Sequence, residues 1–267
     1  MKTKLLPRVA VNERRAYFEC YCGQLHVRTA FPSTGGFDEG TPLICLHDLA
    51  STSAAFAGLI SSMGTDRSIY AIDLPGHGES DLAPKNSDVR AYAAAVGDLI
   101  SGLRLREVDL LGHGFGAAVA AELAALMEPV VRSVVLVDAP SGAVPAWPIW
   151  EPNEAAEDLA AVFRAARSAH AQRESLQAFT LRFATSLARA EQVNLAVAAL
   201  SEWPAAERWR QMKPRPIALD AGRRRAAVAD LIPGGRSLDG SAIGADMFLT
   251  ESGDLADQLR SFLDGKN

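Results

Sequence analysis

The sequence predicts a single α/β domain: a mostly parallel sheet flanked by helices, with a helical segment inserted into it. First, short and mostly apolar runs alternate with amphipathic segments, which is the pattern of parallel strands joined by helices. Second, the stretch 151–212 is rich in Ala, Arg and Glu and contains no strand pattern. Third, 267 residues, of which 48% are hydrophobic, are enough to form one large core.

The first half of the chain supplies most of the expected strands. Alternating residues from Tyr17 to Arg28, broken by Gly23, predict a hairpin, and the Gly- and Pro-rich stretch from Phe31 to Gly40 predicts a loop. A wholly apolar run at 43–46 and mostly apolar runs at 68–72, 108–111 and 131–137 predict buried strands. The segments that follow the first three of these runs predict helices at 53–63, 87–103 and 117–127.

The second half begins with the insertion and then returns to the sheet. A Pro-rich stretch from Val144 to Pro148 precedes the helical segment, and Lys213-Pro214-Arg215-Pro216 ends it. We expect, in order, a strand at 217–219, a short helix at 226–232, a strand at 236–243 and an amphipathic helix at 252–263. Residues 1–143 and 213–267 are therefore assigned to a core, and residues 144–212 to a helical cap. Such a cap would cover the carboxyl edge of the sheet, where ligands bind in folds of this kind.

Composition narrows the class of protein. The formal net charge of −5 gives no electrostatic footprint for nucleic acid. No run resembles a signal peptide or a membrane span, so we expect a cytoplasmic protein without membrane contacts. An odd number of cysteines, Cys20, Cys22 and Cys45, suggests buried free thiols in a reducing compartment, and Cys20-x-Cys22 lacks the spacing of metal ligands. We expect no cofactor and no metal, and the sequence is compatible with a homo-oligomer.

The most informative stretch joins a predicted strand to a predicted helix. An apolar run from Val108 to Leu111 leads into Gly112-His113-Gly114-Phe115-Gly116, and a helix of small residues follows. This is the layout of a nucleophile elbow, in which a G-x-S-x-G turn presents its central side chain to a pocket. Here the central residue is Gly114, which has no side chain to act as a nucleophile.

Taken with three further motifs, this turn resembles the α/β-hydrolase family. Gly23-Gln24-Leu25-His26-Val27-Arg28 is similar to its early hairpin, and Leu46-His47-Asp48 to its oxyanion loop. Asp73-Leu74-Pro75-Gly76-His77-Gly78-Glu79-Ser80 is similar to its Asp-x-Pro-Gly-x-Gly-x-Ser turn. The resemblance extends over nearly the whole chain and implies an α/β-hydrolase core with an inserted helical cap.

The resemblance also implies where the catalytic groups of the family would lie. It places Gly114 at the nucleophile, Arg225 at the acid and Asp246 at the histidine, and assigns the backbone amides of Leu49 and Phe115 to the oxyanion hole. Loss of a serine nucleophile alone costs roughly 10⁶ in rate, which argues against serine-esterase chemistry. We hypothesise that Arg225 and Asp246 form an ion pair in place of the usual acid–histidine pair.

A few polar groups remain as candidates for other chemistry. Asp48 occupies the place of a family glycine, and its carboxylate would either act as a general acid or base or bind nearby amides. His113 and His47 are tentative partners in catalysis, each weighed against a packed, hydrogen-bonded role. Asp138, at a strand end, is a minor candidate for the acid. His77 and Asp73 are expected to be structural.

Two classes of function follow. In the first, the protein binds or acts on a small, largely apolar molecule between cap and core, by lyase, isomerase, decarboxylase or direct water-attack chemistry that uses Asp48 with His47 or His113. In the second, it is a non-catalytic pseudoenzyme that senses or carries a ligand or serves as a partner subunit. The aromatic residues of the insertion either line a pocket or pack in the core: Trp147, Trp150, Phe163, Phe179, Phe183, Trp203 and Trp209.

Overall fold

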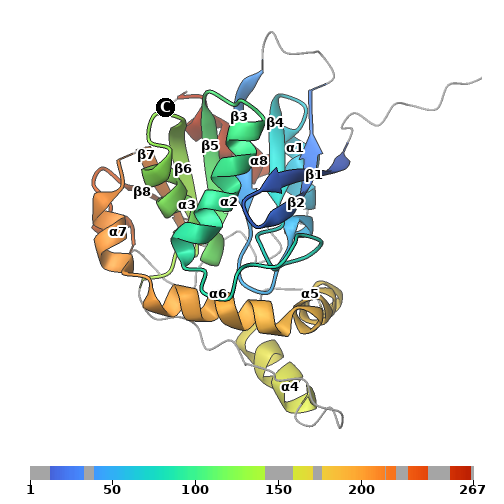
Figure 1. Ribbon diagram of the computed structural model, residues 1–267. Helices are drawn as coiled ribbons and strands as arrows, with labels where there is room; N and C mark the ends of the chain where they lie inside the picture. Colours follow the sequence, from blue (N-terminus) through green and yellow to red (C-terminus); the bar gives the residue numbers. More distant parts are fainter. Residues whose placement is uncertain are drawn as a thin grey trace, which may run out of the picture.

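A single eight-stranded sheet forms the centre of the computed structural model (Figure 1). The structure describes residues 13–32, 39–141, 159–170, 176–213, 215–220, 228–239 and 253–265. The strands are β1 (Arg14–Cys20), β2 (Gly23–Ala30), β3 (Gly40–Leu46), β4 (Arg67–Ile72), β5 (Val108–His113), β6 (Val131–Val137), β7 (Arg215–Asp220) and β8 (Arg236–Asp239). Their order is β1-β2-β4-β3-β5-β6-β7-β8, and the six from β4 to β8 in that order are parallel. Strand β2 is antiparallel to both β1 and β4. The predicted fold class is confirmed.

Helices cover both faces of this sheet. They are α1 (Ala57–Met63), α2 (Val89–Gly102), α3 (Phe115–Leu126), α4 (Leu159–His170), α5 (Leu176–Ala188), α6 (Ala190–Glu202), α7 (Ala205–Gln211) and α8 (Gly253–Leu263), with short 3₁₀ helices at Ser53–Phe56 and Ala229–Leu231. Helices α2 and α3 pack on one face and α1 and α8 on the other (Figure 1).

The four apolar residues at the end of β3 show why this segment forms a central strand. Ile44 and Leu46 pack into the cluster beneath α2 and α3, whereas Leu43 and Cys45 pack into the cluster beneath α1 and α8. All four side chains are fully buried. A strand covered on both faces needs apolar residues at every position, because successive side chains point to opposite faces.

The first hairpin differs in detail from the prediction. Its two-residue turn is Tyr21–Cys22, and β2 begins at Gly23, whose φ of +126° suits glycine. Cys22 therefore lies in the turn rather than in a strand. All three cysteines are free, but only Cys45 is buried, because Cys20 and Cys22 lie at the edge of the sheet and are half-buried. The prediction of three buried thiols is wrong for these two.

The expected helical segment contains α4 to α7, and α6 runs along the carboxyl ends of the parallel strands (Figure 1). Buried side chains of α6 and α7 form hydrogen bonds to loops of the sheet. Gln192 of α6 accepts a hydrogen bond from the Ala83 amide at 2.9 Å, and Trp209 of α7 donates one to the Pro140 carbonyl at 2.9 Å. The division into core and cap stays a prediction, and Val144–Pro148, Trp147 and Trp150 lie outside the described residues.

The aromatic residues of the insertion divide into two groups. Phe163, Phe179 and Phe183 form a small cluster of their own between α4 and α5, with ring centroids 5.0–5.9 Å apart. Trp203 and Trp209 instead join the main core cluster, where their rings meet edge to face at 5.0 Å. These described aromatic residues pack against one another, as side chains of a core do.

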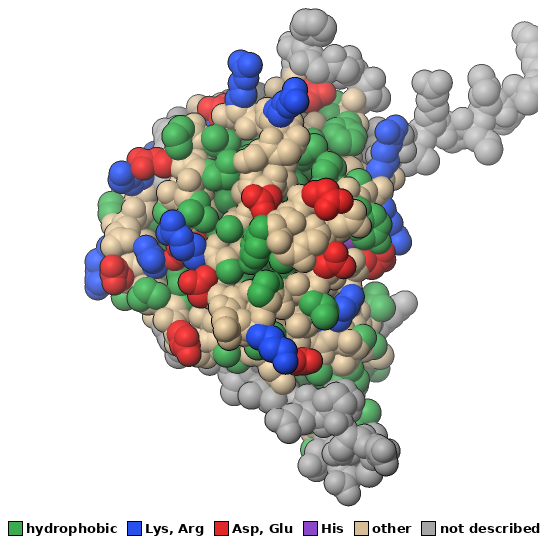
Figure 2. Space-filling model, in the orientation of Figure 1, with side chains coloured by type: hydrophobic (Ala, Val, Ile, Leu, Met, Phe, Trp, Pro, Cys, Tyr) green, Lys and Arg blue, Asp and Glu red, His purple; other side chains and the backbone are tan. Residues whose placement is uncertain are grey.

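Charged side chains of both signs are interspersed on the face shown in Figure 2. None of the helices in the described part of the chain combines the length and apolarity needed to cross a membrane.

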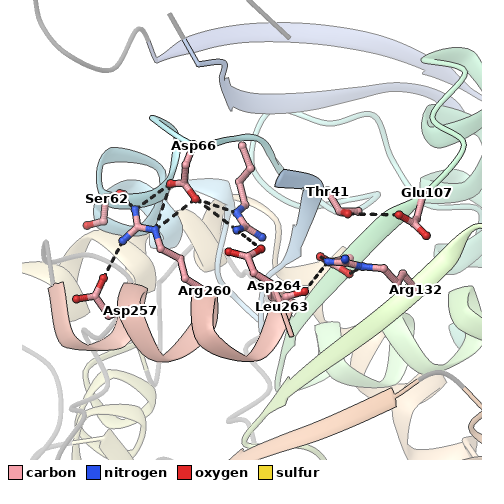
Figure 3. Close-up of polar contacts among 11 residues, drawn as sticks. Thr41, Ser62, Asp66, Glu107, Arg132, Asp257, Arg260, Leu263 and Asp264 are labelled. Atoms are coloured by element: carbon pink, nitrogen blue, oxygen red, sulfur yellow. Dashed lines mark hydrogen bonds and ion pairs between the residues drawn. The ribbon is translucent and has the colours of Figure 1, made fainter. Parts of the chain in front are cut away.

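At the amino ends of the parallel strands, a network of charged side chains holds α8 against the sheet (Figure 3). Arg260 of α8 donates to Asp66 at 2.9 Å, to the Ser62 carbonyl at 2.6 Å and to Asp257 at 3.0 Å. The fully buried Arg67 donates to Asp264 at 2.8 Å. The network lies at the edge of the sheet opposite α6 and joins α8 to the segment that leads into β4.

Replacing Arg260 with Ala is expected to lower the free energy of unfolding by about 1–2 kcal/mol, because Asp66 and the Ser62 carbonyl lose a charged donor. Arg90, an exposed residue of α2, is the matched control, and Arg90→Ala should stay within about 0.5 kcal/mol of the parent. Urea denaturation of the two variants measures the difference. Equal stabilities would show that the contacts of Arg260 add nothing to stability.

Candidate functional site

The turn between β5 and α3 forces two backbones into close contact. A Cβ atom at Gly116 would overlap the Leu46 carbonyl and lie 2.7 Å from the His47 carbonyl oxygen. One at Gly112 would lie 2.6 Å from the Ala117 Cα atom. These two glycines therefore allow α3 to start directly beside the end of β3. Gly114, between them, has φ +54° and ψ −114°, a conformation that side-chain-bearing residues rarely adopt.

The Asp48 carboxylate fills the space beside Gly114. Its Oδ1 atom accepts hydrogen bonds from the Leu49 and Phe115 amides, both at 2.8 Å. A Cβ atom at Gly114 would overlap Oδ1 and Cγ of Asp48 and lie 2.7 Å from Oδ2. The two amides that the resemblance assigns to the oxyanion hole thus both bind a side chain of the chain itself. Of the two roles considered for Asp48, this geometry is that of binding nearby amides.

The site beside the Leu49 and Phe115 amides also favours a negative charge. Phe115 is the first residue of α3, so its amide belongs to the positive end of the helix dipole. Charge-assisted hydrogen bonds to backbone amides are about twice as strong as neutral ones. An oxygen anion formed during ester hydrolysis would need the same two donors, and Asp48 would oppose it both by occupancy and by charge.

Both ring nitrogens of His47 have hydrogen-bond partners in the structure. Its ring is fully buried, Nε2 accepts the Leu74 amide at 3.0 Å, and Nδ1 lies 2.8 Å from the Asp48 carbonyl oxygen. Because Nε2 accepts, Nδ1 carries the proton and donates it to that carbonyl. Burial lowers the pKa of His47, which favours this neutral form. The ring joins the loop after β3 to the loop after β4.

Asp73 organises the loop after β4. Its carboxylate accepts hydrogen bonds from the His26 ring at 2.8 Å, the Ser53 amide at 2.6 Å and the Glu79 amide at 3.0 Å. Burial by itself would raise the pKa of Asp73, but these donors and the nearby His47 ring outweigh burial and hold the pKa well below its ordinary range. The buried carboxylate is therefore ionised and structural in its contacts.

His77 lies in the same loop and is also buried. Nδ1 is 3.1 Å from the Pro75 carbonyl oxygen, and Nε2 contacts no partner among the described residues. Its ring centroid lies 5.1 Å from that of His47. Burial, reinforced by the nearby His47, lowers the pKa of His77 to about 3.

These two histidines predict acid sensitivity. Their folded pKa values lie below the ordinary value of about 6.5, so the unfolded chain takes up protons that the folded chain refuses. Stability is therefore complete above about pH 6.5 and is lost as the pH falls below it. The protonation of His77 in the unfolded chain should by itself lower the free energy of unfolding by about 1.4 kcal/mol between about pH 8 and pH 5.5. His47 should lower it further.

Urea denaturation at several pH values measures this loss, and His77→Asn, which removes one titrating group, should flatten the dependence. An unchanged slope in that variant would show that His77 is not held neutral.

His113 and Asp138 end neighbouring parallel strands. Nε2 of His113, the last residue of β5, lies 3.6 Å from Oδ2 of Asp138, which follows β6, and both side chains are about one-fifth exposed or less. Asp138 has φ +48°. An imidazole beside a carboxylate can accept and hold a proton. The sequence offers both residues as candidates but does not indicate that they pair. The pairing arises because β5 and β6 are adjacent and His113 lies opposite Val137, the residue before Asp138.

Two residues in the predicted site lie outside the described residues: Arg225 and Asp246. Their hypothesised ion pair stays a prediction. Within the part of the chain that the structure describes, no group of three or more His, Cys, Asp or Glu side chains is arranged to hold a metal.

Comparison with known proteins places the chain in context. The model of the "Alpha/beta hydrolase family" matches residues 43–259. A "Serine hydrolase-like protein" of Danio rerio is 35% identical over 105 residues, which cover 39% of this chain and 32% of that protein. The chain spans about a third of the length of the first curated relatives that it matches.

Solved structures share the fold at low identity. A hydrolase from Pseudomonas aeruginosa superposes with a TM-score of 0.77 at 16% identity, covering 94% of this chain and 98% of that one. A mutant of the N-acyl homoserine lactonase AidH with glycine in place of a serine, complexed with N-hexanoyl homoserine lactone, gives a TM-score of 0.72 at 18% identity. It covers 94% of this chain and 97% of that one. These likenesses concern the fold alone.

Proposed function

Because this chain belongs to the alpha/beta hydrolase family, we propose that it is a non-catalytic member, which binds a small, largely apolar molecule without serine-hydrolase chemistry. One observation carries the proposal: Asp48 Oδ1 accepts both the Leu49 and the Phe115 amide at 2.8 Å. Hydrolysis of an ester by this fold needs those donors for the oxyanion. It also needs a nucleophile at the turn, where Gly114 supplies none.

The glycine at position 114 and the position of the Asp48 carboxylate depend on each other sterically. Any side chain at Gly114 would overlap the Asp48 carboxylate, and the carboxylate reaches the two amides through the space that a side chain at Gly114 would occupy. A glycine at the turn and an aspartate in the loop after β3 are therefore compatible as a pair. A serine at the turn together with this Asp48 rotamer is not.

Ligand binding is supported by two helices that contact the loops at the carboxyl ends of the strands. Gln192 binds α6 to Ala83 in the loop after β4, and Trp209 binds α7 to the Pro140 carbonyl. These contacts hold both helices in place. The structural neighbour with glycine in place of a serine is complexed with N-hexanoyl homoserine lactone, so a protein of this fold that carries a serine-to-glycine replacement can hold that lactone.

The test compares three proteins on an aryl ester and on a fluorophosphonate probe: the parent chain, Gly114→Ser, and Asp48→Gly with Gly114→Ser. We expect hydrolysis by the parent to equal the buffer rate and no labelling by the probe. Gly114→Ser alone should also be inactive, because Asp48 occupies the space beside the turn. Asp48→Gly with Gly114→Ser removes that overlap and should still be inactive, because Asp246 stands where the resemblance expects a histidine. If N-hexanoyl homoserine lactone binds the parent, it should still be recovered without hydrolysis beyond the buffer rate. Hydrolysis or labelling of the parent would contradict the proposal.

A second candidate function rests on the His113–Asp138 pair. With 3.6 Å between Nε2 and Oδ2 and partial exposure of both side chains, the pair could act as a general base for proton-transfer chemistry beside the turn. This candidate requires turnover that disappears in His113→Asn. Turnover that survives His113→Asn and Asp48→Asn would exclude both residues as its source.

A further inference from the structure

The hairpin of β1 and β2 lies at the edge of the sheet (Figure 1), and its turn brings two thiols together. The Sγ atoms of Cys20 and Cys22 lie 3.4 Å apart and share a hydrogen bond. Both side chains are half-buried, and both pack on the main core cluster. They therefore lie on the same side of the hairpin, while Tyr21 between them is 51% exposed.

Backbone contacts hold the turn in this shape. The Tyr21 amide donates to Asp98 of α2 at 2.8 Å, and the Gln24 amide donates to Asp81 at 2.8 Å. Gly23, with φ +126°, allows the chain to reverse directly after Cys22. Alpha carbons two residues apart in such a turn are within the range that a disulfide spans, about 4.4–6.8 Å. The thiols are thus preorganised for a bond with each other.

We propose that Cys20 and Cys22 form a reversible intramolecular disulfide, which makes this turn a modification site for low-molecular-mass disulfides such as oxidised glutathione. One cysteine thiolate attacks a sulfur of the oxidant, forms a mixed disulfide and releases one glutathione thiolate. The second cysteine thiolate attacks the protein sulfur of that mixed disulfide and releases the other glutathione. Two cysteines are oxidised, one disulfide is reduced to two thiols, and the two protons pass from the cysteines through solvent to the leaving thiolates.

Cys45 is the internal control, because it is fully buried and its thiol faces the core beneath α1 and α8. Burial and the neighbouring Cys20 thiol raise the pKa of the Cys22 thiol to about 12, so exchange is slow at neutral pH. The experiment therefore uses a long incubation of the intact chain in oxidised glutathione at about pH 8, followed by unfolding in urea, alkylation and digestion with trypsin.

We expect the tryptic peptide 16–28, which carries both cysteines, to lose two hydrogens and to regain them after dithiothreitol. The peptide with Cys45 should be found alkylated only. In Cys20→Ser and Cys22→Ser, the remaining thiol should keep one glutathione, because no partner is present to displace it. A wild-type peptide that carries glutathione on either cysteine, or that stays unmodified while the urea-unfolded chain is oxidised, would overturn the proposal.

Discussion

Replacing Gly114 with Ala is expected to lower the free energy of unfolding by about 3 kcal/mol or more. The new Cβ atom would overlap Oδ1 and Cγ of Asp48, and the backbone at φ +54° and ψ −114° would be strained in any residue with a side chain. Overpacking and backbone strain each cost about 1–3 kcal/mol. Urea denaturation, followed by circular dichroism, measures the loss.

The two costs can be separated with Asp48→Gly. Without the Asp48 side chain the overlap disappears while the backbone strain remains, so Gly114→Ala should cost about 1–3 kcal/mol less in that background. Asp48→Gly alone is the control, because it also removes the acceptor of the Leu49 and Phe115 amides. Additive effects, within about 0.5 kcal/mol, would show that Asp48 does not occupy the space beside Gly114.

Gly116→Ala is expected to be at least as severe, with a loss of about 4 kcal/mol or a failure to fold. Its Cβ atom would meet backbone atoms of β3 and the following loop, the Leu46 and His47 carbonyls, which cannot rotate away as a side chain can. Asp48→Gly should give no rescue here. Thermal unfolding by circular dichroism compares the variants.

The control for Gly116→Ala is Gly102→Ala at the end of α2, where a Cβ atom would meet nothing within 4 Å. That variant should be neutral or slightly stabilised. If Gly116→Ala unfolded at the parent's temperature, the close approach of α3 to β3 would be wrong.

Much of the fold could be predicted because burial on both faces of a sheet leaves a direct mark on the sequence. The mostly apolar run 131–137 coincides with β6, and the amphipathic helix predicted at 252–263 is α8, whose Leu255 and Leu259 are both buried. The hairpin turn was less accessible, since alternation through Cys20 and Cys22 looks the same whether the chain reverses there or later. Near the end of the chain, the predicted helix at 226–232 is described only as the 3₁₀ turn Ala229–Leu231.

The candidate site was predictable in its backbone and not in its side chains. The resemblance indicates the amides of Leu49 and Phe115, because strand-to-helix geometry fixes where they point. Whether Asp48 would turn toward them or toward solvent depends on its rotamer and on the space left by Gly114, so the sequence left both roles open. The contacts of His47 are a similar case, because its partners Leu74 and the Asp48 carbonyl come from two loops.

The central claim is that the Asp48 carboxylate binds the Leu49 and Phe115 amides. Amide proton shifts in ¹H–¹⁵N correlation spectra test it most directly. Both amides should resonate at low field in the parent, as donors to a carboxylate, and both should move upfield together in Asp48→Ala. Asp81→Ala, the control, should move the Gln24 amide and leave these two in place. If the Leu49 and Phe115 resonances stayed unchanged in Asp48→Ala, the claim would be contradicted.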